Sequence, residues 1–184
     1  MRKILIAITG ASGSIYAKNI LAKLSEAKGD FEISVVLSST ANQVWQTELD
    51  EQFSCDGKFR IYDQNDFLAP FASGSGNYDT MIIIPCSMGT LGRIAGGISN
   101  DLITRAADVI LKERRKLICV VRETPYNLIQ IKNMESITLA GGIICPATPS
   151  FYSKPSTIND VVNSVVDRIL DLAKIPVSTF RWGS

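Results

Sequence analysis

The chain has 184 residues, of which 46% are hydrophobic and 20% are charged, and its formal net charge is +1. A chain of this length can bury a full hydrophobic core, and the composition is typical of an ordinary globular protein. The balanced charge excludes a general electrostatic attraction to nucleic acid or acidic membranes. Any cationic function must therefore be local, and we expect residues 1–184 to form a single domain.

The chain contains no histidine, which removes the usual zinc-hydrolase ligands and any histidine general base, so no metal site is predicted. Its four cysteines form no CxxC pair and are interpreted as reduced, mostly buried thiols of a cytoplasmic protein. The apolar run in MRKILIAITG is too short for a secretory signal and is better interpreted as a first strand. No later apolar segment approaches the length needed to span a membrane.

Apolar runs of strand length alternate along the chain with helical patterns. Strands are expected at residues 4–8, 33–37, 81–84, 117–121 and 142–145, and helices at about 13–27, 40–48, 87–98, 102–114, 126–140 and 158–173. This alternation predicts an α/β fold, a three-layer Rossmann-like or flavodoxin-like sandwich with a mostly parallel sheet. Irregular structure is expected at 50–77, 146–155 and 175–184.

A glycine-rich turn, TGASGS, follows the first predicted strand and precedes a helix. Backbone N–H groups at such a helix start can bind a phosphate, and the hydroxyls of Ser12 and Ser14 add donors. The turn is not GxGxxG and lacks the lysine of a P-loop, so a mononucleotide phosphate is favoured. The alternative is a structural turn with a serine N-cap.

A second turn of this kind, PCSMGT, follows the strand predicted at 81–84 and again precedes a helix. Its small residues would let a flat ring approach closely. Ser38 and Glu48 bracket the helix between the two turns, and Glu48 taken alone is more typical of a solvated surface. Two such turns on neighbouring strands of one sheet together favour a nucleotide site over two structural turns.

The stretch RAADVILKERRKLICVVRETP carries clustered charges around a buried strand. Arg105 and Lys112 are seven residues apart and share roughly one helix face. Arg122 and Glu123 directly follow the strand, at the edge where open parallel sheets place their ligands. We interpret these groups as aimed at one crevice, where they suit a phosphate ester whose leaving group needs charge neutralisation and a proton. Thr124-Pro125 is expected to start a helix, and the alternative for the charges is a structural salt-bridge network.

Other candidate residues carry a weaker signal. The segment ASGSG at 72–76 fits either a flexible linker or a backbone nest for an anion. Tyr152, Arg168 and Trp182, taken singly, are more typical of packing or surface positions than of a site.

Together these segments resemble the UbiX-type flavin prenyltransferases, the UbiX/Pad family, within the homo-oligomeric flavin-containing cysteine decarboxylase-like folds. The most specific part is RAADV-LKERR followed by RETP, in that order and spacing. The resemblance covers nearly the whole chain, from Thr9 to Gly183. The matching stretches are TGASGSIY, TELD, ASGSG, PCSMGTL, LITRAADVILKERR, VVRETP, FYSKP and RWG.

The resemblance implies a metal-independent prenyltransferase that joins a dimethylallyl group from dimethylallyl monophosphate to N5 and C6 of reduced FMN. The prenylated flavin would serve a UbiD-type decarboxylase, and the enzyme would be a homo-oligomer, commonly a dodecamer. FMN would be bound by Gly10, Ala11, Ser12, Ser38, Ser87, Met88, Gly89, Thr90 and Arg122. The prenyl phosphate would contact Gly74, Arg105, Lys112, Arg122, Tyr152 and Arg168. The expected catalytic residues are Ser12, Glu48, Lys112, Glu123 and Trp182, with Trp182 near the allyl cation.

Two other functions share some of these sequence features. A decarboxylase of the phosphopantothenoylcysteine type shares the fold, but its chemistry relies on an active-site histidine, which this chain lacks. A non-catalytic FMN carrier, or a subunit associated with a decarboxylase, would keep both glycine turns. It would not need Arg105, Lys112, Glu123, Tyr152 and Arg168 together. One departure from the family is Ser39, which stands where a lysine is common.

Overall fold

The computed structural model describes residues 1–55, 57–176, 179 and 183 of the chain. Its sheet has the strand order β3-β2-β1-β4-β5-β6, and every neighbouring pair is parallel. The strands are β1 (Arg2–Ile8), β2 (Phe31–Leu37), β3 (Arg60–Tyr62), β4 (Thr80–Cys86), β5 (Lys116–Val121) and β6 (Ile143–Ile144). The predicted parallel sheet is confirmed, and its order is that of the Rossmann type.

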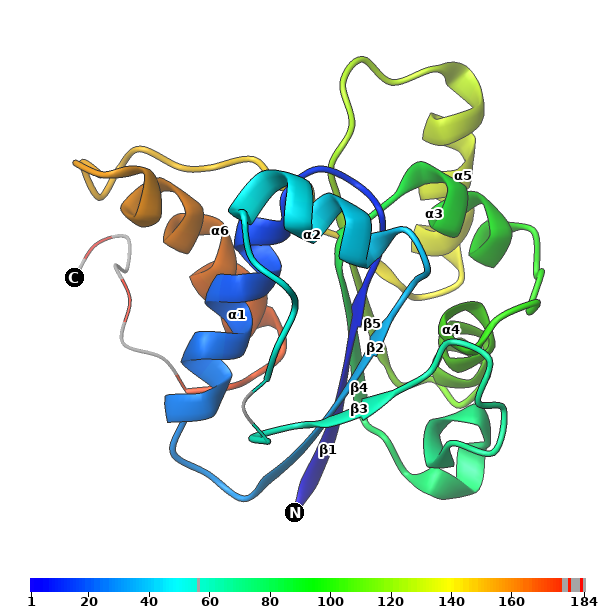
Figure 1. The fold of residues 1–184 in the computed structure, drawn as a ribbon. Helices are drawn as coiled ribbons and strands as arrows, with labels where there is room; N and C mark the ends of the chain where they lie inside the picture. Colours follow the sequence, from blue (N-terminus) through cyan, green and yellow to red (C-terminus); the bar gives the residue numbers. More distant parts are fainter. Residues whose placement is uncertain (56, 177–178, 180–182, 184) are drawn as a thin grey trace.

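Helices cover both faces of this sheet, which makes the predicted three layers (Figure 1). Alternate residues of β1 serve the two layers: Ile4, Ile6 and Ile8 pack toward one helical layer, and Leu5 and Ala7 toward the other. The first layer holds α1 (Ser14–Glu26), α2 (Ala41–Leu49) and α6 (Ile158–Leu172). The second holds α3 (Met88–Ala95), α4 (Leu102–Lys112) and α5 (Leu128–Leu139). None of these described helices is both long and apolar enough to cross a bilayer.

Two local expectations were wrong. The segment expected to be irregular contains the edge strand β3, and α5 begins at Leu128, not at Thr124-Pro125. The helix starts there because Asn127 forms a capping box: its side chain accepts from the Gln130 N–H at 2.9 Å, and the Gln130 side chain accepts from the Asn127 N–H at 3.0 Å. Glu123 therefore lies in the loop between β5 and α5.

Candidate active site

A cavity of about 520 Å³ opens at the carboxyl edge of the sheet, beside the ends of β1, β2 and β4. The strand order reverses between β1 and β4, which is the point where open α/β sheets bind their ligands. The cavity is lined by Gly10, Ser38, Ser39, Thr40, Gln64, Asn65, Ser87, Gly89, Thr90, Arg93, Asn100 and Asp101. Five of the residues that were predicted to bind FMN therefore lie around one cavity, although they come from three separate segments of the chain: Gly10, Ser38, Ser87, Gly89 and Thr90.

Hydroxyl groups at this cavity are held in place by a short hydrogen-bond chain. Ser87 caps α3: its Oγ accepts from the Thr90 N–H at 3.2 Å and donates to Thr90 Oγ1 at 3.0 Å. The Ser87 N–H donates to Thr9 Oγ1 at 2.9 Å, and Thr9 Oγ1 donates to the Pro85 carbonyl at 2.7 Å. The two glycine-containing turns are thereby connected, so their donors keep a fixed relative position.

Gly10 is required at its position because the turn passes directly against the loop after β2. A Cβ at Gly10 would lie 2.1 Å from Thr40 Oγ1, whereas a Cβ at Gly89 would meet nothing within 4 Å. Gly89 therefore faces open space in the cavity.

This contrast gives a prediction for Gly89→Ala. Replacing a helical glycine by alanine stabilises a helix by roughly 0.5–1 kcal/mol, so the melting temperature of the ligand-free protein should stay the same or rise. The new methyl group occupies cavity space, so FMN affinity should fall by about tenfold or more. Thermal melts and FMN titrations of the variant measure the two effects. Undiminished FMN affinity would show that the flavin does not approach Gly89.

The glycine turn after β1 holds a carboxylate in this structure. Glu48 accepts from the Gly13 N–H at 3.0 and 2.9 Å through its two oxygens and from the Ser14 N–H at 2.7 Å. Burial raises the pKa of Glu48, but hydrogen bonds from the Ser12 hydroxyl and from Gly13 and Ser14 outweigh it and hold the pKa below its ordinary value. Glu48 is therefore an anion bound at the start of α1, although the residue is exposed, as expected for a surface glutamate.

Arg122 joins this group from the end of β5. Its Nε donates to the Ser12 carbonyl at 3.0 Å, and the half-buried Glu123 beside it accepts from the Thr124 N–H at 3.1 Å. Ser12, Glu48 and Arg122 thus surround one turn at the carboxyl edge, with Glu123 next in the chain. Of the remaining predicted flavin residues, Ala11 lies in this turn and Met88 is the first residue of α3.

The predicted phosphate residues of α4 lie elsewhere on the molecule. Arg105 donates through Nε to the Ala72 carbonyl at 3.0 Å and pairs through Nη1 with Asp108 at 2.9 Å. Lys112 pairs with Glu113 at 2.6 Å. The Gly74 carbonyl accepts from Arg115 Nη2 at 2.8 Å, within two consecutive short 3₁₀ turns, Pro70–Ala72 and Gly74–Gly76. The ASGSG segment is therefore an ordered part of the fold and not a linker.

These positions correct the expectation that one chain aims all four charged groups at a single crevice. Lys112 ends α4 just before β5 begins, and Glu123 follows the end of β5. A six-residue strand spans about 20 Å, so Lys112 and Glu123 lie at opposite edges of the sheet. The proposed salt-bridge network does not form either, because Arg105 and Lys112 pair with neighbours on their own segment.

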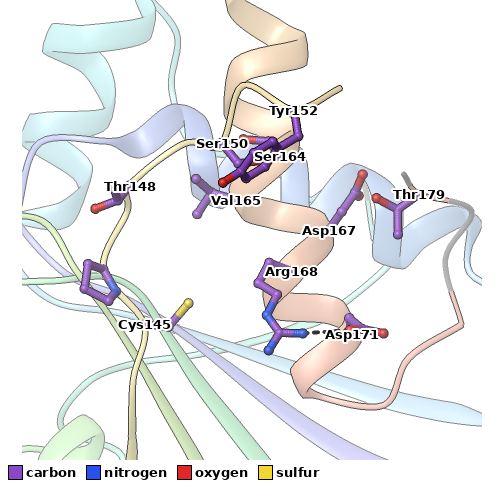
Figure 2. Close-up of a pocket in the computed structure, with 11 residues that line it drawn as sticks. Cys145, Thr148, Ser150, Tyr152, Ser164, Val165, Asp167, Arg168, Asp171 and Thr179 are labelled. Carbon is purple, nitrogen blue, oxygen red and sulfur yellow. Dashed lines mark hydrogen bonds and ion pairs between the residues drawn. The ribbon is translucent and has the colours of Figure 1, made fainter. Parts of the chain in front are cut away.

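Tyr152 and Arg168 line a further cavity of about 530 Å³ over α6, in the other helical layer (Figure 2). Arg168 Nη1 pairs with Asp171 at 2.9 Å, and the side chain of Cys145 faces the same cavity. Burial raises the pKa of the Cys145 thiol more than the charge of Arg168 lowers it, so the thiol is neutral at neutral pH. The remaining predicted residue, Trp182, lies outside the described residues.

Asp101, which lines the cavity at the carboxyl edge, makes the stability of the fold depend on pH. Burial raises its pKa, but hydrogen bonds from the Thr104 N–H and from Arg93 outweigh burial, and the pKa lies below its ordinary value. A lowered folded-state pKa stabilises the fold above the unfolded-state value of about 3.9, and this stabilisation is lost as the pH falls through the folded-state value. Urea unfolding of Asp101→Asn should therefore show a weaker loss of stability below about pH 4 than the parent protein shows. Identical pH profiles would contradict the assigned ionisation.

A Rossmann-order sheet with a mononucleotide-sized cavity at its switch point is typical of a nucleotide-binding protein. A family model described as Flavoprotein matches residues 1–170. The flavin prenyltransferase UbiX of Methanocaldococcus jannaschii is 44% identical over 185 residues, covering 99% of each chain. That of Pseudomonas aeruginosa is 40% identical, covering 98% of this chain and 94% of its own.

Solved structures agree with these relatives. AnUbiX (PadA1), in complex with FMN and dimethylallyl pyrophosphate, superimposes with a TM-score of 0.91 at 38% identity and 98% coverage of both chains. A dodecameric FMN-dependent UbiX-like decarboxylase from Escherichia coli O157:H7 gives a TM-score of 0.92 at 35% identity, covering 97% of this chain and 98% of that one. The chain belongs to the flavin prenyltransferase family.

Proposed function

We propose that this protein joins the dimethylallyl group of dimethylallyl monophosphate to N5 and C6 of reduced FMN, giving a prenylated flavin for a UbiD-type decarboxylase. The main support for this proposal is one cavity at the switch point. It is lined by residues from three segments of the chain that were each predicted to bind FMN. Its volume of about 520 Å³ lies within the usual range of small-molecule sites, roughly 300–1,000 Å³. Its hydroxyl donors and the open space at Gly89 fit a mononucleotide.

The cations of the chain would act on the donor phosphate. Reduced FMN supplies the nucleophilic positions at which the new bonds form. As the donor C–O bond breaks, its electron pair leaves with the phosphate, and Arg105, Lys112 and Arg168 would stabilise that charge. Tyr152 would orient the phosphate through its hydroxyl, and Trp182 would face the allylic carbon.

The carboxylates of Glu123 and Glu48 would transfer protons during the reaction. Ring closure at C6 needs a proton delivered to the alkene and another removed from the ring. Glu123, half-buried beside Arg122, would relay these protons between the retained phosphate and the reacting atoms. Hydrogen bonds from Ser12, Gly13 and Ser14 keep Glu48 ionised. At the start of the reaction it would therefore act as a proton acceptor and not as a donor.

A second copy of the chain would complete this site. Lys112 and Glu123 lie at opposite edges of the sheet in one chain, and Arg168 lies in the opposite helical layer from α4. Apolar side chains on the surface fit contacts between copies: Leu128, Ile129 and Leu139 of α5 and Leu68 are 65%, 71%, 80% and 96% exposed. We also propose that residues 1–184 act as one flavoprotein domain in the cytoplasm, where free thiols like these four persist.

Mass spectrometry of the flavin tests this function. The protein is incubated anaerobically with reduced FMN and either dimethylallyl monophosphate or the diphosphate, then denatured to release its flavin. A flavin heavier by one prenyl unit is expected with the monophosphate. Bound but unmodified FMN with both donors would overturn the transferase and favour a flavin carrier.

A further inference from the structure

We infer that Arg93 binds the phosphate group of FMN in the cavity at the carboxyl edge, a role that rests on the proposed flavin site. Among the described residues that line this cavity, Arg93 is the one cation and Asp101 the one carboxylate. Arg93 lies one helical turn beyond Thr90, which in turn lies three residues after Ser87, so the three side chains share one face of α3.

The guanidinium group of Arg93 is held in a defined orientation. Its Nη1 donates to Asn100 Oδ1 at 2.8 Å and to Asp101 Oδ2, and its Nη2 donates to Thr90 Oγ1 at 3.3 Å. The side chains of Arg93 and Asp101 are 30% and 14% exposed. The cation is therefore partly shielded from water, where a charge-assisted hydrogen bond to a phosphate is strong.

The hydroxyl group of Thr90, beside Arg93, can donate a hydrogen bond to a ligand. Its Oγ1 accepts from both Ser87 Oγ and Arg93 Nη2. A hydroxyl group with its acceptor positions used in this way still has one hydrogen to donate. Ser38 and Thr40, whose hydroxyls lie 3.2 Å apart, line the same cavity from the loop after β2. The cavity thus offers hydroxyl donors together with a cation, which is the chemistry that a phosphate monoester needs.

The alternative position for the phosphate, at the start of α1, is disfavoured by charge. Glu48 already accepts from the Gly13 and Ser14 N–H groups there, and a second anion on the same donors would be repelled. In the carboxyl-edge cavity, the one carboxylate is already paired with Arg93. Of the two turns predicted from sequence to bind a phosphate, the one before α3 is therefore the better site.

Paired titrations with FMN and riboflavin test this role without relying on prenyl transfer. Riboflavin shares the ring and ribityl chain but lacks the phosphate, so the ratio of the two dissociation constants isolates the phosphate contact. Arg93→Gln should weaken FMN binding by about tenfold to a hundredfold and leave riboflavin binding unchanged. Arg93→Lys, which keeps the charge, should recover part of the loss.

Asp101→Asn is a matched variant that should change FMN affinity in the opposite direction to Arg93→Gln. Asparagine caps helices as well as aspartate does, so α4 keeps its N-terminal cap while Arg93 loses a competing carboxylate. FMN binding should tighten several-fold, by about the strength of one screened charge pair, and riboflavin binding should not change. Equal weakening of FMN and riboflavin by Arg93→Gln, or no effect of either substitution on the FMN-to-riboflavin ratio, would overturn the assignment. The prenylation assay above is independent, so its failure would count against the function and not against Arg93.

Discussion

Glu123→Gln is expected to slow formation of the prenylated flavin by about 10²–10⁴-fold, the usual contribution of a positioned acid–base group. Glutamine keeps the size of the side chain and can still accept from the Thr124 N–H, as Glu123 does at 3.1 Å. It cannot carry a proton between the phosphate and the reacting atoms. Because Glu123 does not line the flavin cavity, FMN affinity should remain within about twofold.

Single-turnover kinetics, followed by mass spectrometry of the released flavin, measure this loss separately from binding. Glu26→Gln is the matched control, since Glu26 is an exposed carboxylate at the end of α1, away from the proposed site and from the exposed apolar side chains of α5. Normal turnover by Glu123→Gln would show that the proton relay runs through another group. Loss of FMN binding would show that the substitution disturbs the cavity, and the catalytic assignment would then fail.

Lys112→Ala is expected to lower the rate of prenyl transfer by about 10²–10³-fold, because the leaving phosphate loses a positioned cation. The fold should tolerate the change: Lys112 is 49% exposed, and its contact with Glu113 is a surface ion pair worth about 0–1 kcal/mol. FMN affinity should not change, since Lys112 lies at the edge of the sheet opposite the flavin cavity.

Rate measurements at saturating and limiting dimethylallyl monophosphate separate binding of the donor from its ionisation. Lys112→Arg should recover part of the rate through its charge, and Lys28→Ala, at an exposed lysine between α1 and β2, serves as the surface control. An unaffected rate in Lys112→Ala would remove α4 from the proposed phosphate site.

The sequence was sufficient for the features that depend on local pattern. Apolar runs alternating with amphipathic segments predicted the parallel three-layer fold, and small residues after two strands predicted a nucleotide site at the edge where the cavity lies. Both kinds of signal are contained in a few adjacent residues. The start of α5 was misplaced because Asn127 and Gln130 compete with Thr124-Pro125 as capping signals, and the sequence contains both.

Features that depend on distant contacts were missed. Nothing near Glu48 in the sequence shows that its carboxylate reaches Gly13, 35 residues away. Gln64 and Asn65 line the flavin cavity because the short strand β3 brings their loop there. Arg93 could have been noticed, since Ser87, Thr90 and Arg93 follow one another at helical spacing. Lys112 and Glu123 lie at opposite edges of the sheet because the strand β5 runs between them. That separation is evident only when the position of β5 is known.

The most direct test of the central claim, a prenyl-transfer site shared between copies, is a mixed oligomer. Lys112→Ala and Glu123→Gln chains are coexpressed with different tags, and oligomers that contain both are purified through the two tags in sequence. If each site takes Lys112 from one copy and Glu123 from another, random mixing restores both groups in about a quarter of sites. A shared site predicts that prenylated flavin then forms at about a quarter of the parent rate, far above either variant alone. Activity no higher than that of the single variants would contradict it.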